Sequence, residues 1–587
     1  MKKYIFLMSA VVFIICIAAI FFIFAKPVLG AVRLEYTLKP VSREDGTIDI
    51  NIRILRNSRF APESFTLAAG GFSPDGTVCT DNEGRKVLFD IKDNQLVIGP
   101  ASAESKYLDF SYRVEIGGFS GSAYQGIHKD GSIAFSGENA LYLPYYAAAD
   151  EKSVISKITL TADTGSGIKS MLPYKNSSTD TDRAEIKKPG WRALYNLAKS
   201  CYAFGNFDNK VIKTKNGNLN ILLDPEFKAD LPEDTAGIIS SLYDYYSELF
   251  ESPLNDYDIL ILPANPSDGK TTFAGVGGSS LGISLNNGSG ADIKTFSHTL
   301  YSAFFDNKIH IENIHYQPNL WLYKGLASYY EALSLESLPE GIKSRFGFDG
   351  AGEFRDMYTR YIYFRLKEPT LYQLSPADEK SALQGQLQFY FYTEAPLIIK
   401  NIEDMASADF NKNKALLSYL LKHKDDREIS VSDLMLWAVG SNEQIFRNYL
   451  SGETILPYSG ILSGLEDPAG IINKLNSYER LLCSWNQREF PIYPYDDINL
   501  LDPEKLADAV LKEDVKFAPE DTEKMVGAFS PTVFMLLKQY KLRADVCGLK
   551  DINDPMLKYK LLNDEVNINK WNEYLKTSGL DVKVKRN

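Results

Sequence analysis

The stretch "TFSHTLYSAFFDNK", residues 295–308, has the periodicity of an amphipathic helix. Three large apolar residues recur every four positions and are expected to face a hydrophobic core, namely Phe296, Leu300 and Phe304. His298 and Ser302 recur at the same spacing on another face of the helix. This second face presents one imidazole and one hydroxyl, and the flanking segments indicate what kind of domain carries it.

Upstream of this helix the pattern predicts a strand, a helix and a strand. Two short apolar runs, Leu219 to Leu223 and Asp258 to Leu262, flank the helical segment "DTAGIISSLYDYYSELF". Gly275, Gly277 and Gly278 then form a flexible approach to a short apolar run, Gly282 to Leu285. These elements indicate an α+β domain that includes the helix with His298.

Downstream of this helix the chain is expected to be mostly helical. The segment "NLWLYKGLASYYEALSL" predicts a helix that starts near Asn319, and further apolar stripes follow beyond Pro369. In "ISVSDLMLWAVG", Ser432 is expected to cap a helix. After Ser451 a looser region precedes a last group of capped helices.

The first part of the chain after residue 30 alternates apolar and polar residues with period two. The runs "TIDINIRI" (residues 47–54) and "LDFSYRVEI" (residues 108–116) are typical of half-buried strands. In "VLFDIKDNQLVIGP" two more runs flank a polar turn at Asp93 and Asn94. Residues 31–208 are therefore predicted to form an antiparallel β-sandwich.

An apolar run near the amino terminus predicts a membrane helix. Residues Tyr4 to Ala25 contain no charge, and 22 helical residues are long enough to cross the hydrocarbon layer. Lys2 and Lys3 precede the run, so the amino terminus is expected in the cytoplasm and the bulk of the chain outside it. The alternative is a cleaved signal peptide that ends near "KPVLGA".

Composition and charge exclude some classes of function. The 587 residues are 44% hydrophobic and 24% charged, as is usual for globular domains, and they are too many for one core. The net charge of -12 argues against nucleic acid as a partner. The five cysteines contain no CxxC spacing, which excludes a structural zinc cluster, and they are expected to be buried thiols rather than disulfides.

The order of these parts resembles the gluzincin zinc peptidases of the peptidase MA clan. The similarity is to the aminopeptidase N-like and glycyl aminopeptidase-like families and covers roughly residues 200 to 440. "GGSSLGISL" resembles the substrate-binding edge strand of the family, and "YTEAP" resembles the segment that carries its transition-state tyrosine, which would be Tyr392. The resemblance implies these substrate-binding candidates: Gly277, Gly278, Gly282, Ile283 and Ser284.

The catalytic motif of the family is degenerate in this chain. In the family, the two histidines of HExxH and a glutamate on the next helix bind zinc, and the glutamate of the motif activates water. Carried over by position, His298 matches the first histidine, Thr299 the general base and Ser302 the second histidine, whereas Lys324 matches the glutamate ligand. One imidazole does not hold a catalytic zinc, which takes about three protein ligands. No metal cofactor is therefore expected.

Together these observations predict a membrane-anchored, extracytoplasmic pseudopeptidase that binds a peptide or a protein. The predicted fold is multidomain α+β. A transmembrane helix lies in residues 1–30, a β-sandwich in 31–208, a thermolysin-like or gluzincin-like domain in 209–450 and a helical region in 451–587.

Two alternative functions and the role of one side chain remain open. The chain is an active zinc aminopeptidase if His310, Glu312 and His315 supply unorthodox ligands beside His298. It is an extracytoplasmic scaffold if the C-terminal helices bind a partner. Lys324 itself either extends to solvent or pairs with a carboxylate, for which Glu331 and Glu336 are the candidates.

Overall fold

The computed structural model describes residues 32–440 and 543–577 apart from internal gaps, of which the longest are 145–154, 225–233, 264–271, 368–383 and 407–413. The chain divides into two compact units, Met1–Glu312 and Asn313–Asn587. No helix within the described residues is both long and apolar enough to span a bilayer. The run Tyr4 to Ala25 and most of residues 451–587 lie outside the described residues, so those expectations stay predictions.

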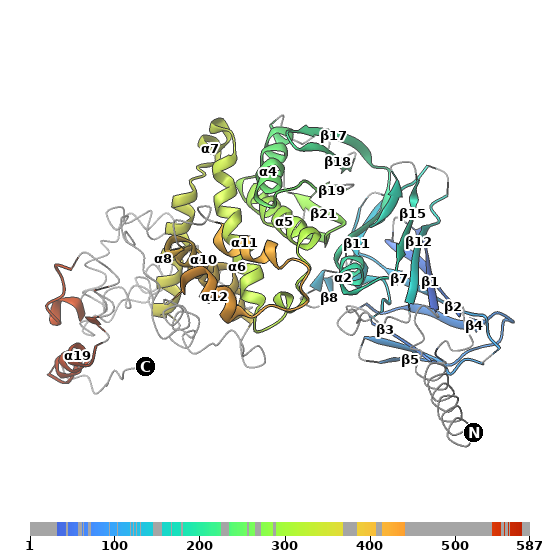
Figure 1. Ribbon diagram of the computed structural model, residues 1–587, viewed down its shortest axis with the longest axis horizontal. Helices are drawn as coiled ribbons and strands as arrows, with labels where there is room; N and C mark the ends of the chain where they lie inside the picture. Colours follow the sequence, from blue (N-terminus) through green and yellow to red (C-terminus); the bar gives the residue numbers. More distant parts are fainter. Residues whose placement is uncertain are drawn as a thin grey trace, which may run out of the picture. The chain divides into compact units, whose positions relative to one another are not determined.

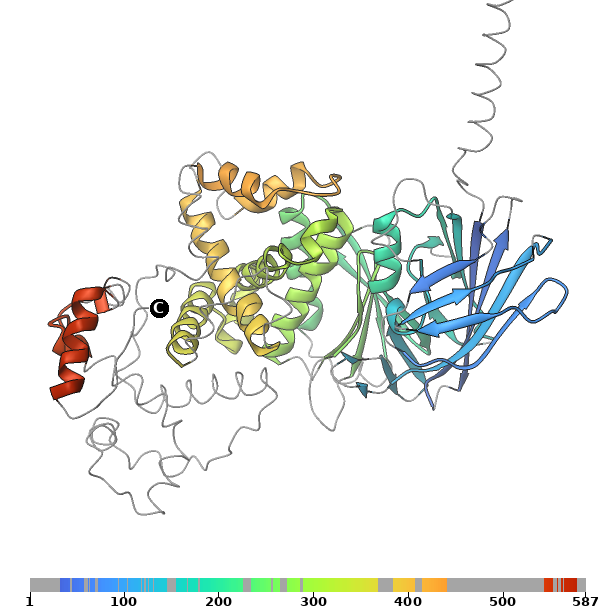
Figure 2. The ribbon, with the colours of Figure 1, turned by 90° about the horizontal axis from the view of Figure 1, so that it is seen from below.

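A seven-stranded sheet forms the first layer of the first unit (Figures 1 and 2). In spatial order its strands are β14 (Lys175–Ser177), β15 (Asp180–Lys187), β12 (Ile155–Ala162), β1 (Val32–Ser42), β2 (Thr47–Arg56), β7 (Tyr107–Glu115) and β4 (Asp75–Asp81). The predicted alternation is confirmed, because the four isoleucines of "TIDINIRI" are fully buried. The prediction of a wholly antiparallel sandwich is wrong, since β12 pairs with β1 in parallel. The chain leaves this sheet after β7 and returns as β12, which lies beside β1 and runs parallel to it.

Smaller sheets complete this part of the unit. A four-stranded sheet has the order β10 (Ile127–Lys129), β11 (Ser132–Ser136), β16 (Cys201–Gly205) and β13 (Lys169–Met171). A three-stranded sheet has the order β3 (Phe65–Ala68), β6 (Gln95–Ile98) and β5 (Phe89–Lys92), and β8 (Phe119–Ser120) pairs with β9 (Ala123–Tyr124). The turn between β5 and β6 is where the sequence predicts it, and Asn94 there has a φ of 61°.

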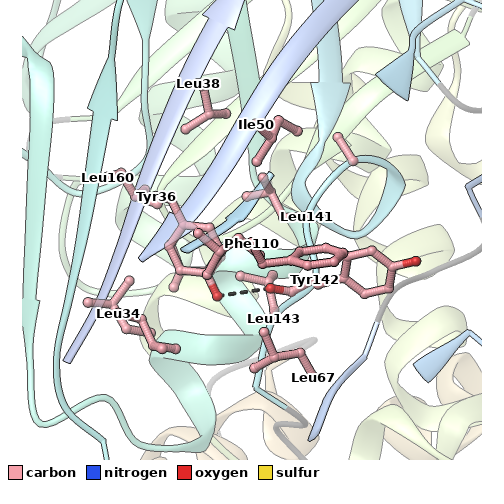
Figure 3. Packing of buried hydrophobic residues seen from close by; sticks show 14 of the residues in the cluster. Leu34, Tyr36, Leu38, Ile50, Leu67, Phe110, Leu141, Tyr142, Leu143 and Leu160 are labelled. Atoms are coloured by element: carbon pink, nitrogen blue, oxygen red, sulfur yellow. Dashed lines mark hydrogen bonds between the residues drawn. The ribbon is translucent and has the colours of Figure 1, made fainter. Parts of the chain in front are cut away.

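One hydrophobic core joins these sheets (Figure 3). It contains buried side chains from the seven-stranded, four-stranded and three-stranded sheets together with the segment around Tyr142. The Tyr36 hydroxyl donates to the Tyr142 carbonyl oxygen at 2.9 Å, and Tyr112 donates to the Ala140 carbonyl oxygen at the same distance. These bonds satisfy polar groups inside the core, which would otherwise destabilise it. Two helices that the sequence does not predict lie in this region, η1 (Gly137–Asn139) and α2 (Trp191–Lys199).

A five-stranded sheet follows in the same unit, and helices α4 (Thr235–Leu249) and α5 (Gly290–Lys308) pack against it (Figure 1). Its order is β17 (Asp208–Thr214), β18 (Gly217–Leu223), β19 (Asp258–Pro263), β21 (Ser280–Leu285) and β20 (Thr272–Val276). The three inner strands run parallel, whereas β17 and β20 are antiparallel to their neighbours. The predicted strand, helix and strand are thus confirmed as β18, α4 and β19.

The five-stranded sheet is fixed to the four-stranded sheet by a second, smaller core. Apolar side chains of β11, β13 and β16 meet Leu222, Leu260 and Leu262. Two hydrogen bonds cross the same junction, from Ser132 Oγ to Asp224 Oδ2 at 2.9 Å and from Ser280 Oγ to the Cys201 carbonyl oxygen at 2.8 Å. The strand that begins with Ser280 therefore has a defined position on the preceding domain.

The second unit is helical over its described residues, as the sequence predicts. Its elements are α6 (Leu320–Ser334), η4 (Leu335–Ser337), α7 (Glu340–Phe346), α8 (Gly350–Lys367), α9 (Gln384–Phe389), the π-helical turn η6 (Tyr390–Glu394), α10 (Ala395–Met405), α11 (Ala415–Lys422), α12 (Val431–Val439) and α19 (Glu565–Thr577); η3 (Glu312–His315) precedes α6. Helix α6 begins after Asn319, as predicted. The expected cap at Ser432 is wrong, because the Ser430 hydroxyl accepts from Asp433 N and starts α12 two residues earlier.

Glu403 is a buried carboxyl group that connects two of these helices. It lies on α10, only 6% exposed, and accepts from Ala415 N at 2.7 Å and Leu416 N at 2.9 Å, the first amides of α11. Burial raises the pKa of Glu403 from 4.5 to about 7, against the opposing effect of these two hydrogen bonds. A raised pKa means that the folded state holds a proton that the unfolded state has already released.

Glu403 should therefore make the second unit less stable as the pH rises through the window from about 4.5 to 7. We expect the free energy of unfolding of Glu403→Gln, relative to that of the wild type, to increase by about 2 kcal/mol between pH 5 and pH 8, because glutamine does not ionise. Thermal unfolding of both proteins at the two pH values measures this difference. A difference in melting temperature that is the same at pH 5 and pH 8 would contradict it.

Candidate functional site

Helix α5 owes its start to a capping box. The Ser289 hydroxyl accepts from Asp292 N at 3.2 Å, and the Asp292 carboxylate accepts from Ser289 N at 2.9 Å. Both residues satisfy amides that the first helical turn leaves without partners. The helix therefore begins at Gly290, eight residues before His298.

Aromatic packing against α4 fixes the rotation of α5. The three apolar residues predicted to face the core, Phe296, Leu300 and Phe304, are at most 2% exposed. The Phe304 ring lies 5.4 Å from that of Tyr243, and the Tyr246 hydroxyl bonds to Ser297 Oγ at 2.8 Å. The predicted inner face of the helix is confirmed, and the face with His298 is the opposite one.

The residues that match the catalytic motif are bonded to their own helix. Thr299 is buried, and its hydroxyl donates to the Thr295 carbonyl oxygen at 2.7 Å. The Ser302 hydroxyl donates to the His298 carbonyl oxygen at 3.3 Å, and the His298 side chain is half-buried. Both hydroxyl protons are thus used in backbone bonds one turn back. Neither side chain can act as a carboxylate base or an imidazole ligand.

Gly277 and Gly278 form a tightly bonded turn between β20 and β21. The Gly277 carbonyl oxygen accepts from the Tyr257 hydroxyl at 2.6 Å, and the Gly278 carbonyl oxygen accepts from Asn307 Nδ2 at 2.6 Å. A Cβ atom on Gly278 would lie 2.7 Å from the Asp306 carbonyl oxygen. These two candidates for substrate binding therefore bond to side chains of this chain, and close packing explains why they are glycines.

The strand that carries the other three candidates is not at the sheet edge. Gly282, Ile283 and Ser284 lie on β21, which pairs with β19 on one side and β20 on the other. The prediction of an edge strand at this position is wrong. The edge strand on this side of the sheet is β20. Its Gly275 has a φ of +149°, and a Cβ atom on this residue would lie 2.8 Å from the Cys201 backbone. The signal in the sequence was Gly275, which marks the irregular outer strand.

In the second unit, Lys324 lies half-buried on α6. Its Nζ lies 5.4 Å from the centroid of the Tyr323 ring, which is a cation–π contact. The carboxylate of Glu336 accepts from Gly350 N at 2.6 Å and lies 3.7 Å from Lys343 Nζ. Glu336 thus pairs with Lys343, and its predicted pairing with Lys324 is not the one found.

Tyr392 lies within the π-helical turn η6, also in the second unit. Its side chain is half-buried, while its neighbours Phe391 and Thr393 are buried. Single π-turns inside α-helices are rare and are common at functional sites. The turn therefore distinguishes Tyr392 from the many core tyrosines, a feature that the residue pattern does not show.

The candidate donor groups that the structure describes do not fit a catalytic zinc. The alternative ligands have other roles, because His310 Nε2 lies 3.3 Å from the Asn307 carbonyl oxygen and the His315 ring lies 4.7 Å from that of Tyr323. Glu312 is buried. Within the described part of the chain, no three His, Cys, Asp or Glu side chains are grouped so that they could hold an ion. A zinc peptidase site takes about three such ligands and an open position.

No family model and no curated protein matches the sequence. Solved structures do. An aminopeptidase N family protein from Idiomarina loihiensis is 12% identical, with a TM-score of 0.47 over 80% of this chain and 78% of that chain. An M1 zinc metallopeptidase from Deinococcus radiodurans is 14% identical, with a TM-score of 0.46 over 73% of this chain and 95% of that chain.

A third similar structure is of aminopeptidase A from Legionella pneumophila, which is 12% identical with a TM-score of 0.45, and the match covers 72% of this chain but 49% of that chain. The first of these structures is of an aminopeptidase N family protein, the family that the sequence resembles.

Proposed function

We propose that this protein is a membrane-anchored, extracytoplasmic pseudopeptidase that binds extended peptide without cleaving it. The observation that carries the proposal is the bonding of the α5 hydroxyls. Thr299 and Ser302, at the positions of base and second ligand, both donate to carbonyl oxygens of their own helix. A peptidase of this kind needs a carboxylate and an imidazole there, because water activation and zinc binding depend on them.

Peptide binding needs no metal if the ligand pairs with a sheet edge. Backbone hydrogen bonds then supply the affinity, and the side chains of alternate residues supply the specificity. The five-stranded sheet ends in β17 on one side and in β20 on the other, and β20 is the edge strand that pairs with β21. We therefore assign the peptide to β20 in place of the inner strand that the sequence suggested.

Metal content tests the loss of catalysis. The full chain, purified in detergent and dialysed against micromolar zinc, is expected to retain well under one zinc per chain by elemental analysis. One zinc per chain that a chelator removes and that His298→Ala abolishes would refute the proposal and establish the active metallopeptidase. The scaffold alternative concerns the C-terminal helices of residues 451–587, most of which lie outside the described part of the chain.

Restoring one ligand should restore metal binding. Ser302→His places a second imidazole one helical turn from His298, and histidines four residues apart chelate one ion. We expect the zinc affinity of this variant to exceed that of the wild type at least about tenfold, measured by titration calorimetry. Ser302→Gln is the matched control, because it has a similar volume but no imidazole. Equal affinities in all three proteins would contradict this prediction.

Peptide binding is tested separately with Tyr-Ser-Ala, the substrate present in a structure of a Deinococcus metallopeptidase mutant. The tripeptide should slow amide hydrogen exchange in β20 and remain intact after prolonged incubation. Cleavage would contradict the loss of activity. Unchanged exchange in β20 at millimolar peptide would contradict the assigned binding mode and leave the zinc result untouched.

A further inference from the structure

The number of residues between the apolar run and strand β1 limits how far the seven-stranded sheet lies from the membrane. This inference rests on the membrane anchor of the proposed function. The apolar run ends at Ala25, and strand β1 begins at Val32. Seven residues span at most about 25 Å even when fully extended. The start of β1 is therefore held near the bilayer surface whenever the run crosses it.

One row of residues crosses the end of the sheet at which β1 begins. Val32 pairs with Arg56, and its carbonyl oxygen accepts from Ser156 Oγ. On one side of this pair, Lys188 N donates to the Ser156 carbonyl oxygen at 2.9 Å. On the other side, Arg56 N donates to the Lys106 carbonyl oxygen at 2.9 Å, and Lys106 N donates to Asn82 Oδ1 at 2.8 Å. Lys86 follows next, because it bridges to Thr80 at the end of β4.

We call this row and the adjoining turn the proximal end; it consists of Val32, Arg56, Asn82, Glu83, Arg85, Lys86, Glu104, Lys106, Ser156, Lys188 and the buried Asp81. Its cations outnumber its carboxylates by five to three, in a chain whose net charge is -12. Asp81 and Glu83 are both paired with Arg85, at 2.7 and 3.1 Å. Lys86, Lys106 and Lys188 are exposed.

Apolar side chains are exposed beside the proximal end. Leu88 is 77% exposed and Val78 is 49% exposed. A hydrogen bond of 3.0 Å from Val87 N to the Cys79 carbonyl oxygen places the two segments next to each other. Exposed lysines next to exposed aliphatic residues are the combination that binds lipid surfaces, since the lysines attract headgroups while the apolar side chains enter the interface.

We propose that the proximal end contacts the bilayer and binds anionic phospholipid headgroups through Lys86, Lys106 and Lys188. The anchor holds these lysines close to the surface, so weak individual attractions act at a high effective concentration. The attraction falls off within a Debye length of about 10 Å at 0.1 M salt. Contact with the lipid would fix the orientation of the first unit above the membrane.

The experiment uses the full chain in nanodiscs of pure phosphatidylcholine and of phosphatidylcholine with about 30% phosphatidylglycerol. Hydrogen exchange of the amides in residues 82–88 and 102–107 is the readout. We expect exchange to be at least about threefold slower in the anionic discs, and the protection to disappear at 1 M salt, where the Debye length is about 3 Å. The triple variant Lys86→Gln, Lys106→Gln and Lys188→Gln should lose the protection.

The matched control removes three exposed lysines from another sheet, with Lys210→Gln, Lys213→Gln and Lys215→Gln, and should keep the protection. Equal exchange in the two kinds of disc would overturn the proposal, and so would equal loss of protection in both triple variants. A chain that the apolar run does not anchor is distinguished from one that lacks only the lipid contact, because the unanchored chain would elute separately from the discs in gel filtration. That outcome would refute the anchor and the lipid contact together and would leave the zinc and peptide tests unaffected.

Discussion

Replacing Gly325 by valine is expected to destabilise the helical second unit by about 3 kcal/mol, the upper end of the usual cost of overpacking. Gly325 lies on α6 where this helix passes α10. A Cβ atom at this position would lie 2.8 Å from the Ala395 Cβ, 2.8 Å from the Ile399 Cδ1 and 3.1 Å from the Ala395 carbonyl carbon. Real Cβ atoms avoid such distances, and backbone atoms give way only if a helix moves.

Alanine at position 325 should have a smaller effect of the same sign. It gains about 1 kcal/mol of helix propensity over glycine but meets the same two neighbours, so we expect a net loss. Gly341→Ala on α7 is the control, because nothing lies within 4 Å of its Cβ position. Native-state hydrogen exchange of α6 and α10 amides measures the local free energy of opening. If these amides exchanged as slowly in the Gly325→Val variant as in the wild type, the close approach of the two helices would be disproved.

Replacing Tyr36 by alanine is expected to destabilise the core of the first unit by about 3 to 5 kcal/mol, as for other large buried aromatic residues. Tyr36 is fully buried on β1 and donates to the Tyr142 carbonyl oxygen at 2.9 Å (Figure 3). Around it lie buried residues from several strands, among them Leu34, Leu38 and Leu160. The variant creates a cavity and also leaves a buried carbonyl group without this donor, so the two costs add.

Tyr36→Phe separates these two costs. It keeps the ring and removes only the hydroxyl, so we expect a loss of about 1 kcal/mol. Val211→Ala on β17 is the surface control, because Val211 is 56% exposed and should change stability by less than about 0.5 kcal/mol. Hydrogen exchange of the β1 and β2 amides in the full chain provides the comparison. Equal losses for Tyr36→Ala and Val211→Ala would show that the Tyr36 ring is not part of the core.

Much of the local structure could be predicted because its causes are local. The isoleucines of β2 alternate with polar residues, and the structure buries each of them. In α5, the period of four at Phe296, Leu300 and Phe304 identifies the inner face. The polar residues at 299 and 302 can also be recognised from the sequence, because the identity of a residue at a motif position does not depend on the fold.

The identity of the edge strand could not be predicted in the same way. An apolar run such as residues 280–285 has the same composition whether one or both of its sides are paired, and only pairing with β19 and β20 decides this. The roles of Gly277 and Gly278 also depend on distant partners, namely Tyr257 and Asn307.

The sequence by itself determined the type of the regular elements and the presence of hydroxyl side chains at positions 299 and 302 of α5. It did so because side-chain chemistry and periodicity act over a few residues. Only the tertiary structure decided the strand order, the parallel pairing of β1 with β12 and the bonding of the Thr299 and Ser302 hydroxyls. It also brought Lys86, Lys106 and Lys188 to the same end of one sheet as Val32. These features arise from contacts between residues far apart in the chain, and no local pattern encodes which of the possible pairings gives the lowest free energy.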